Sequence, residues 1–151
     1  MRDLLRGEPP HDWDIATAAR PDEMKRIFAG ERILETGLRH GTLTLLIGRE
    51  PVEITSFRAD GDYSDGRRPD EVRFTRSLEE DLSRRDFTVN AMAMDAAGHI
   101  TDPFGGREDI ARGIIRCVGE PERRFSEDAL RMLRAVRFAA RLGFEIDGPT
   151  R

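Results

Sequence analysis

Asp12-Trp13-Asp14-Ile15-Ala16-Thr17 places two carboxylates at the start of a short run that favours a β-strand. Residues two apart on a strand point to the same face, so Asp12 and Asp14 are spaced to hold two divalent metal ions between them. Phosphoryl transfer needs little more than such a clamp, because one ion activates the attacking hydroxyl and the other neutralises the leaving pyrophosphate. The pair alone is weak evidence, because a second pair, Asp60-Gly61-Asp62, occurs in this Asp-rich chain and solvated or capping carboxylates are the alternative.

Helix and strand patterns follow this run. The apolar spacing after Pro21 predicts a helix that stops at Gly30. The runs 43–47 and 52–57 predict the two strands of a hairpin, the second with alternating apolar and polar residues. Glu53, on the second strand, is a candidate for a third acidic group near the metal ions, with an ordinary exposed strand residue as the alternative.

The middle of the chain continues this mixture. Ser77 and Glu80 form a capping-box pattern that predicts a short helix ending near Arg84-Arg85. The run 91–94 and Ile100 flank a polar turn and predict a second hairpin. Helices mixed with antiparallel strands predict an α+β or mixed α/β fold.

A second candidate motif, Arg84-Arg85-Asp86 with Asn90 four residues later, follows the predicted short helix. Arg85 can grip a triphosphate through two hydrogen bonds, with Asp86 holding its guanidinium in place. The alternative is a pair of cations at a helix end, favoured by the helix dipole.

From Glu122 onward the pattern changes to one long helix, predicted over 126–142 with Gly143 as its stop. At about 100° per residue, the small and apolar side chains share one broad face. They are Ala129, Met132, Leu133, Ala135, Val136, Ala139 and Ala140. The charged residues occupy an opposing arc, which periodicity alone predicts to be a solvated surface. They are Glu127, Arg131, Arg134, Arg137 and Arg141.

Asp128 and Arg131 are three residues apart, so on a continuous helix they are neighbours that present an acceptor beside a donor. Cytosine and adenine each show a ring-nitrogen acceptor next to an amino donor, whereas uracil and guanine show a ring N–H donor next to a carbonyl acceptor. The pair is therefore predicted to favour C and A over U and G. The alternative is an exposed helix salt bridge worth a few tenths of a kcal/mol.

Composition narrows the function classes. The net charge of −4 argues against a uniformly basic surface that coats nucleic acid. Lys25 is the only lysine among the 25 basic residues, so nearly all the positive charge is carried by guanidinium groups, which suit bidentate contacts to phosphates and bases. The alternative explanation is a genome base composition that favours Arg codons. The single Cys117 cannot form an internal disulfide, and no apolar stretch resembles a signal peptide or a membrane span. We expect a cytoplasmic chain with a buried Cys117 and no membrane partner.

Together and in this order, the motifs resemble the bacterial class II tRNA nucleotidyltransferases (CCA-adding enzymes) and the closely similar bacterial poly(A) polymerases. The resemblance runs through nearly the whole chain. The matching stretches are 2–7, 12–17, 36–42, 78–82, 84–91, 102–106 and 124–141.

The resemblance implies a DNA polymerase beta-like nucleotidyltransferase head with a mixed sheet and flanking helices, over residues 1–121. It implies that 122–151 begin an α-helical neck that binds RNA. It also implies Asp12 and Asp14 as Mg²⁺ ligands, and a set of nucleotide-binding residues. Those residues are Arg2 and Arg85 for the sugar and phosphates, and Asp128, Arg131, Arg134 and Arg137 for nucleotide recognition.

The activity implied is addition of C and A residues (CCA) to the tRNA 3′ end from CTP and ATP. The alternatives are a poly(A) polymerase that adds only AMP and a catalytically inactive structural fragment. Family members carry a strand ending in Gly-Gly just before the segment matching Met1-Arg2-Asp3, and this sequence begins without it. We therefore expect an incomplete family member that self-associates through uncovered surfaces.

Overall fold

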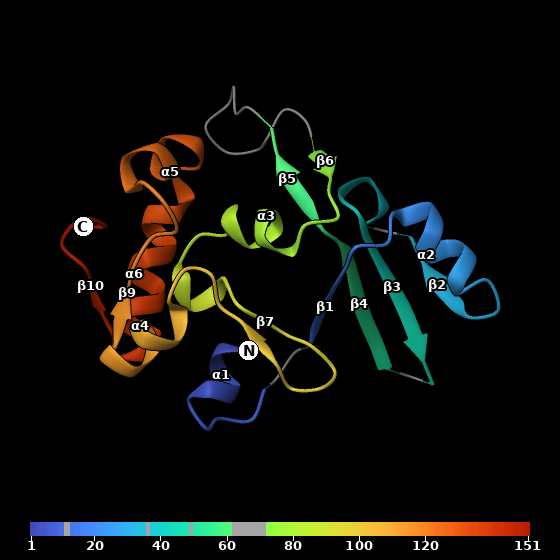
Figure 1. Ribbon diagram of the computed structural model, residues 1–151, viewed down its shortest axis with the longest axis horizontal. Coiled ribbons are helices and arrows are strands. Elements are labelled where there is room, and N and C mark those ends of the chain that lie inside the picture. Colours follow the sequence, from blue (N-terminus) through green and yellow to red (C-terminus); the bar gives the residue numbers. More distant parts are fainter. Residues whose placement is uncertain (11–12, 36, 49, 62–71) are drawn as a thin grey trace. The chain divides into compact units, whose positions relative to one another are not determined.

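The computed structural model describes residues 1–10, 13–35, 37–48, 50–61 and 72–151 (Figure 1). These residues form two compact units. The sheet unit comprises the described residues between 13 and 61 together with 72–81, and the helical unit comprises Met1–Pro10 and Leu82–Arg151. Each unit has a buried apolar core of its own, so each is stabilised by its own contacts.

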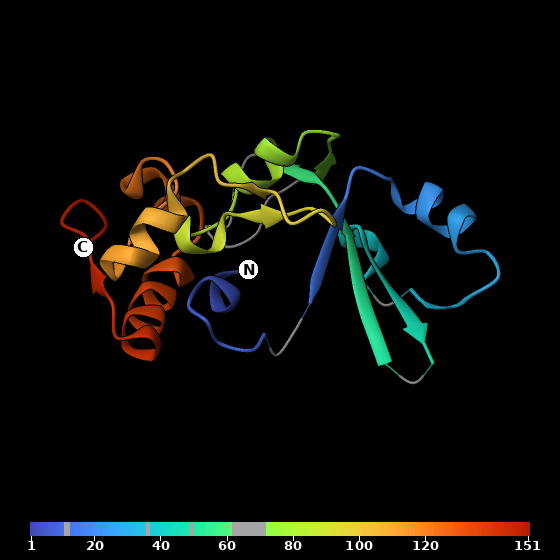
Figure 2. The same ribbon diagram turned by 60° about the horizontal axis from the view of Figure 1, so that its bottom comes forward.

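A four-stranded mixed sheet forms the centre of the sheet unit, with strand order β1-β4-β3-β2. Its strands are β1 (Asp14–Thr17), β2 (Arg32–Leu34), β3 (Thr42–Ile47) and β4 (Glu50–Ser56). β3 and β4 form the antiparallel hairpin that the sequence predicts, while β1 (dark blue) pairs in parallel with β4 (green) in Figure 2. The predicted mixed α/β fold with a mixed sheet is therefore confirmed.

One face of this sheet packs against α2 (Pro21–Ile27), the helix predicted from Pro21. Proline fits the first turn, where the missing N–H has no partner to lose. Met24 points inward from this helix with 1% of its surface exposed, and it packs against one set of strand side chains. That set is Leu43, Leu45 and Ile54. Because side chains alternate along a strand, the other face carries Thr42, Thr44, Glu53 and Thr55.

Short elements complete the sheet unit. They are η1 (Leu38–His40), β5 (Arg58–Asp60) and β6 (Val72–Phe74), with β5 and β6 paired antiparallel. The chain then enters α3 (Leu78–Ser83), where the Glu80 N–H donates to Ser77 Oγ at 3.2 Å. The start of the helix predicted from Ser77 and Glu80 is confirmed.

The helical unit combines short helices with two small strand pairs. Its elements are α1 (Arg2–Leu5), η2 (Thr88–Asn90), β7 (Ala93–Met94), β8 (Ile100–Thr101), α4 (Gly106–Arg112), β9 (Ile114–Ile115), α5 (Pro121–Glu127), α6 (Leu130–Leu142) and β10 (Glu145–Ile146). β7 and β8 form the second predicted hairpin, and β9 and β10 pair in parallel. The core consists of Phe87, Val89, Ile115, Ala135, Phe138 and Leu142.

Cys117 is buried, with 3% of its surface exposed, and burial raises the pKa of its thiol, as expected of a small apolar core residue. None of the helices in the described part of the chain combines the length and the apolar composition that a membrane span requires.

The prediction of one long helix over 126–142 is wrong. The helix is interrupted at Asp128, whose backbone is extended with φ −148° and ψ 101°. The Asp128 carboxylate accepts a hydrogen bond from the Leu130 N–H at 2.9 Å, and such local bonds compete with helical hydrogen bonding. The predicted stop is correct, because Gly143 caps α6 with a left-handed φ of 69°.

The broad apolar face predicted for this helix is only partly turned inward. Met132, Leu133 and Val136 are 49%, 68% and 60% exposed. Of the predicted face, Ala135 is buried and Ala139 packs against the core. The other residues that α6 buries, Arg131, Phe138 and Leu142, lie outside the predicted face. Helical periodicity counts a charged residue as exposed, and it does not register that buried acceptors surround Arg131.

The substitution Gly106→Ala tests the close contact between α4 and η2, the turn that carries Asn90. A Cβ at Gly106 would lie 2.2 Å from the Thr88 backbone oxygen, so Gly106→Ala must push the two elements apart. We expect a loss of about 3 kcal/mol in the free energy of unfolding, measured by urea denaturation. Gly148→Ala is the matched control, because a Cβ there meets nothing within 4 Å. Equal losses in the two variants would contradict this account.

Candidate active site

The acidic part of the candidate site lies on the open face of the sheet. Asp14, the first residue of β1, is in parallel register with Glu53 of β4, and both are exposed. Paired residues of neighbouring strands share a face at a strand spacing of about 4.8 Å, so the two carboxylates are neighbours. Glu53 in turn pairs with Thr44 of β3. The register therefore supports Glu53 as the further acidic candidate.

The predicted partner of Asp14, Asp12, lies outside the described residues. Within those described, no group of three or more His, Cys, Asp or Glu side chains is arranged to hold a metal ion. Asp14 and Glu53 supply two carboxylates, the donor type that hard divalent cations prefer. They would supply part of the predicted metal site, and Asp12 is the further ligand that the sequence predicts.

In the helical unit, Asp86 organises two of the predicted nucleotide-binding arginines. Its carboxylate, 8% exposed, accepts from Arg134 Nε at 2.7 Å and from Asn90 Nδ2 at 3.1 Å. Asn90 Oδ1 accepts from Arg2 Nη1 at 2.8 Å. A continuous chain of hydrogen bonds thus runs from α6 through η2 to α1. The sequence assigned Asp86 to Arg85, and the structure shows Asp86 bound to Arg134.

Arg2 has a second anionic partner, the neighbouring Asp3. Arg2 Nε donates to Asp3 Oδ1 at 2.9 Å. This hydrogen bond lowers the pKa of Asp3, with the charge of Arg2 adding to the effect and burial opposing it. Arg2 is therefore fixed at two of its nitrogens.

A second ionic cluster joins α5 to α6 around Glu127. Its carboxylate accepts from Arg131 Nη1 at 2.9 Å, from Arg123 Nε at 3.1 Å and from Arg124. Arg124 also donates to the carbonyl of Arg85 at 3.1 Å. Arg124 and Arg131 are only 9% and 6% exposed, so their charges are buried together with that of Glu127.

The pKa of Glu127 reflects two opposed influences. Burial acts to raise it, because a charged carboxylate loses solvation. The hydrogen bond from Arg131, the charge of Arg124 and the hydrogen bond from Arg123 outweigh burial and lower the pKa below its ordinary value of 4.5. Glu127 is thus held in its ionised form.

Asp128 and Arg131 are arranged differently from the predicted side-by-side pair. Asp128 lies between the two helices, and its Oδ1 accepts from the Leu130 N–H. Arg131 points inward, where Nη1 also donates to the Arg124 carbonyl at 2.9 Å. The guanidinium that the sequence expected in solvent is fixed from behind by the protein.

Phe138 gathers three of the predicted arginines. The guanidinium carbons of Arg2, Arg134 and Arg137 lie 5.3, 5.2 and 5.3 Å from the centre of its ring. Sequence reasoning missed Phe138, although its spacing of four residues from Arg134 places the two side chains together on a helix. It also missed Glu127 as an internal partner of Arg131.

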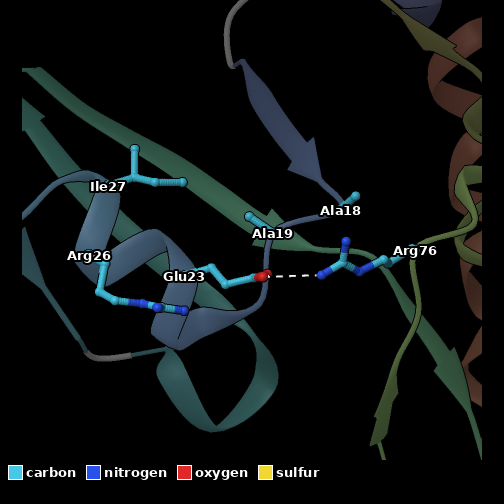
Figure 3. A pocket seen from close by; sticks show the side chains of 6 residues that line it. All are labelled: Ala18, Ala19, Glu23, Arg26, Ile27 and Arg76. Carbon is cyan, nitrogen blue, oxygen red and sulfur yellow. Dashed lines mark hydrogen bonds and ion pairs between the residues drawn. The ribbon is translucent and has the colours of Figure 1, made fainter.

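A separate hollow of about 540 Å³ lies in the sheet unit (Figure 3). Its lining residues are Ala18, Ala19, Glu23, Arg26, Ile27 and Arg76. The ion pair between Arg76 Nη2 and Glu23 Oε1, 3.1 Å apart, joins the two sides that Figure 3 shows. Among the residues that the structure describes, none of the predicted site residues lines this hollow.

Comparison with protein families identifies the chain. The model of the poly(A) polymerase head domain matches residues 1–116. This chain belongs to that family.

Curated relatives and solved structures agree with this assignment. The CCA-adding enzyme of Lactobacillus helveticus is 55% identical over 99% of this chain and 37% of its own length. That of Geobacillus stearothermophilus is 57% identical over 97% of this chain and 36% of its own length. The crystal structure of the Bacillus stearothermophilus CCA-adding enzyme in complex with CTP matches with a TM-score of 0.88 at 52% identity, covering 99% of this chain and 35% of that one.

A more distant structure extends the comparison to RNA. A tRNA nucleotidyltransferase complexed with a primer tRNA and an incoming ATP analog matches with a TM-score of 0.73 at 34% identity, covering 99% of this chain and 42% of that one. The chain thus spans between 35% and 42% of the length of these four proteins. The head-domain family is shown over residues 1–116 of this chain.

Glu127→Gln tests the ionic cluster between α5 and α6. Because the folded-state pKa of Glu127 is lowered, its ionised form stabilises the fold above pH 4.5, and this contribution is lost as the pH falls through the folded-state pKa. We expect the variant to lose about 2 kcal/mol of unfolding free energy at neutral pH. We also expect a smaller further loss in acid than the wild type shows.

Urea denaturation at pH 7 and at about pH 3.5 measures both effects. Glu122→Gln, at an exposed glutamate of α5, is the matched control. A wild-type chain and a Glu127→Gln variant with parallel pH profiles would contradict the role assigned to the Glu127 carboxylate.

Proposed function

We propose that this chain supplies the head of an enzyme that adds C and A residues to the 3′ end of tRNA, using CTP and ATP. The observation that carries the proposal is the match of nearly the whole chain to a CCA-adding enzyme solved with CTP. The exposed Asp14 and Glu53 pair and the arginine clusters of the helical unit are consistent with it, since phosphoryl transfer requires metal ligands and cations for a triphosphate.

Nucleotidyltransferases of this family generally use a divalent metal, and we propose Mg²⁺. Asp12 and Asp14 would hold it, with Glu53 as a further ligand, because the described donors are carboxylates on an accessible strand face. When bound, the metal ions lower the pKa of the attacking hydroxyl and neutralise charge on the leaving pyrophosphate.

The arginines would bind and orient the nucleotide. Arg2 and Arg85 would contact its sugar and phosphates. Arg134 and Arg137 would supply further cations beside the Phe138 ring, which Arg2 also contacts. Asp86 and Asn90 hold the guanidiniums of Arg134 and Arg2, so less side-chain freedom is lost when the triphosphate binds.

Asp128 and Arg131 would read the edge of the base. The guanidinium of Arg131 is fixed by Glu127 and by a backbone carbonyl, which gives it one orientation. Asp128 would accept from the exocyclic amino group while Arg131 donates to the ring nitrogen, so C and A are favoured over U and G.

A poly(A) polymerase that adds only AMP is the second candidate, because the matching family model describes a poly(A) polymerase head. It shares the metal site and the triphosphate cations, and differs in its use of CTP. We place it second because the curated relatives from Lactobacillus helveticus and Geobacillus stearothermophilus, 55% and 57% identical to this chain, are CCA-adding enzymes. A catalytically inactive role remains the third hypothesis from the sequence.

Incorporation of labelled CTP and ATP into a tRNA lacking its 3′ terminus tests the proposal. We expect Mg²⁺-dependent incorporation of both nucleotides when this chain replaces the corresponding third of the Geobacillus stearothermophilus relative, alongside assays of the chain alone. Asp14→Ala should reduce it by about a thousandfold or more, because bound metal ions contribute several kcal/mol to the barrier reduction.

The control is Asp95→Ala, at an exposed carboxylate on the β7–β8 turn. Incorporation of ATP alone would favour the poly(A) polymerase. A chimera that incorporates neither nucleotide, while it binds tRNA and is folded, would contradict the proposed function.

Self-association also remains a prediction, and α6 shows where we expect it. The exposed side chains of Met132, Leu133 and Val136 form an apolar stripe that would be covered in a complex. Sedimentation velocity should show a dimer or larger species that Leu133→Glu converts to monomer. A compact wild-type monomer at all concentrations would contradict this.

The neck boundary at residue 122 and the cytoplasmic location likewise stay predictions.

A further inference from the structure

Phe138 is unusual among the residues of the helical core. The residue is 6% exposed, and its ring packs edge-on against Phe87, with ring centres 5.9 Å apart and an angle of 79°. The same ring lies within 5.3 Å of the guanidinium carbons of Arg2, Arg134 and Arg137. One aromatic side chain therefore belongs both to the apolar core and to the cationic surface above it.

The three guanidiniums differ in what else holds them. Arg134 is bound by Asp86 and Arg2 by Asn90 and Asp3. For Arg137, which is exposed, the Phe138 ring is the contact that the described part of the chain records. Loss of the ring should therefore free Arg137 most.

Charge alone would separate these groups. Three like charges near one centre repel, and the two carboxylates of Asp3 and Asp86 offset only part of that charge. The negative face of an aromatic ring attracts guanidinium groups and presents no hydrogen-bond acceptor that would compete with phosphate oxygens. A ring at this position can gather the cations and leave their N–H groups available to an anion.

We propose that Phe138 is a positioning residue that holds the guanidiniums of Arg2, Arg134 and Arg137 together as a binding site for the triphosphate of the incoming nucleotide. This rests on the proposed function, which supplies the nucleotide. Phe138 itself acts through the arginines and touches neither the nucleotide nor the reacting atoms.

Phe138→Leu removes the ring while it keeps an apolar side chain in the core. Phe87→Leu is the matched control: the same substitution in the same cluster, at a fully buried ring over which no guanidinium is recorded in the described residues. A purely structural role of Phe138 predicts similar consequences for the two variants.

The first measurement needs no ligand. In the ¹H–¹⁵N spectrum of the arginine side chains, Phe138→Leu should move the ring-shifted Nε–Hε signals of the three arginines toward ordinary values, and Phe87→Leu should leave them in place. Unchanged signals in Phe138→Leu would overturn the proposal that the ring positions these groups.

The second measurement is calorimetric binding of Mg²⁺-CTP and of inorganic triphosphate to the 151-residue chain. Phe138→Leu should weaken both about threefold to tenfold, since exposed cation–π contacts are individually modest, and Phe87→Leu should change them less than about twofold. Arg137→Ala should cost less affinity in the Phe138→Leu background than in the wild type, because that guanidinium is already released.

Equal weakening by Phe87→Leu and Phe138→Leu would overturn the proposal, as would equal effects of Arg137→Ala in both backgrounds. A wild-type chain that binds neither probe would refute nucleotide binding by this chain and the functional half of the proposal with it. The spectra would still decide whether Phe138 holds the arginines, so the two failures are distinguishable.

Discussion

The buried ion pair between Glu127 and Arg131 is the constraint on which the helical unit depends. A charge taken out of water is tolerated only when it is paired and hydrogen-bonded, so Arg131 fixes which face of α6 turns inward. That rotation carries Phe138 into the core and leaves Leu133 and Val136 in solvent. It also places Arg134 and Arg137 at the edge of the core, where they meet the Phe138 ring.

Local patterns predicted the parts of the fold that local interactions form. Pro21 marked the start of α2, the alternating run 52–57 marked β4, and Gly143 marked the end of α6. Each of these signals acts within a few residues of the element it specifies. The parallel pairing of Asp14 with Glu53 joins residues far apart in the chain, and its register depends on how a whole strand packs. From the sequence, Glu53 was therefore a candidate third acidic group with an ordinary exposed strand residue as the alternative.

In the candidate site, too, some properties follow from the local sequence and others depend on residues far apart in the chain. The chemistry of its residues was predictable, because carboxylates bind hard cations and guanidiniums bind phosphates whatever their surroundings. Their partners were not: Arg2 and Asn90 are 88 positions apart, and Arg134 and Asp86 are 48 apart. The helical wheel failed at Arg131 for a related reason, since it ranks a residue by its own polarity and ignores acceptors supplied by α5.

The carboxylates and the arginines of the candidate site differ in how firmly the free protein holds them. The reason is electrostatic for the carboxylates and entropic for the arginines. In the proposed metal site, Asp14 and Glu53 would repel each other in the absence of a cation, and an exposed strand face, where water screens the repulsion, suits them in the free chain. Arginines carry long side chains with much rotational freedom, and ordering them only when the ligand binds would weaken binding. Partners such as Asp86 and Phe138 order them during folding. The folding free energy of the helical unit thereby stabilises in advance an arrangement of positive charge that an anion would otherwise have to organise.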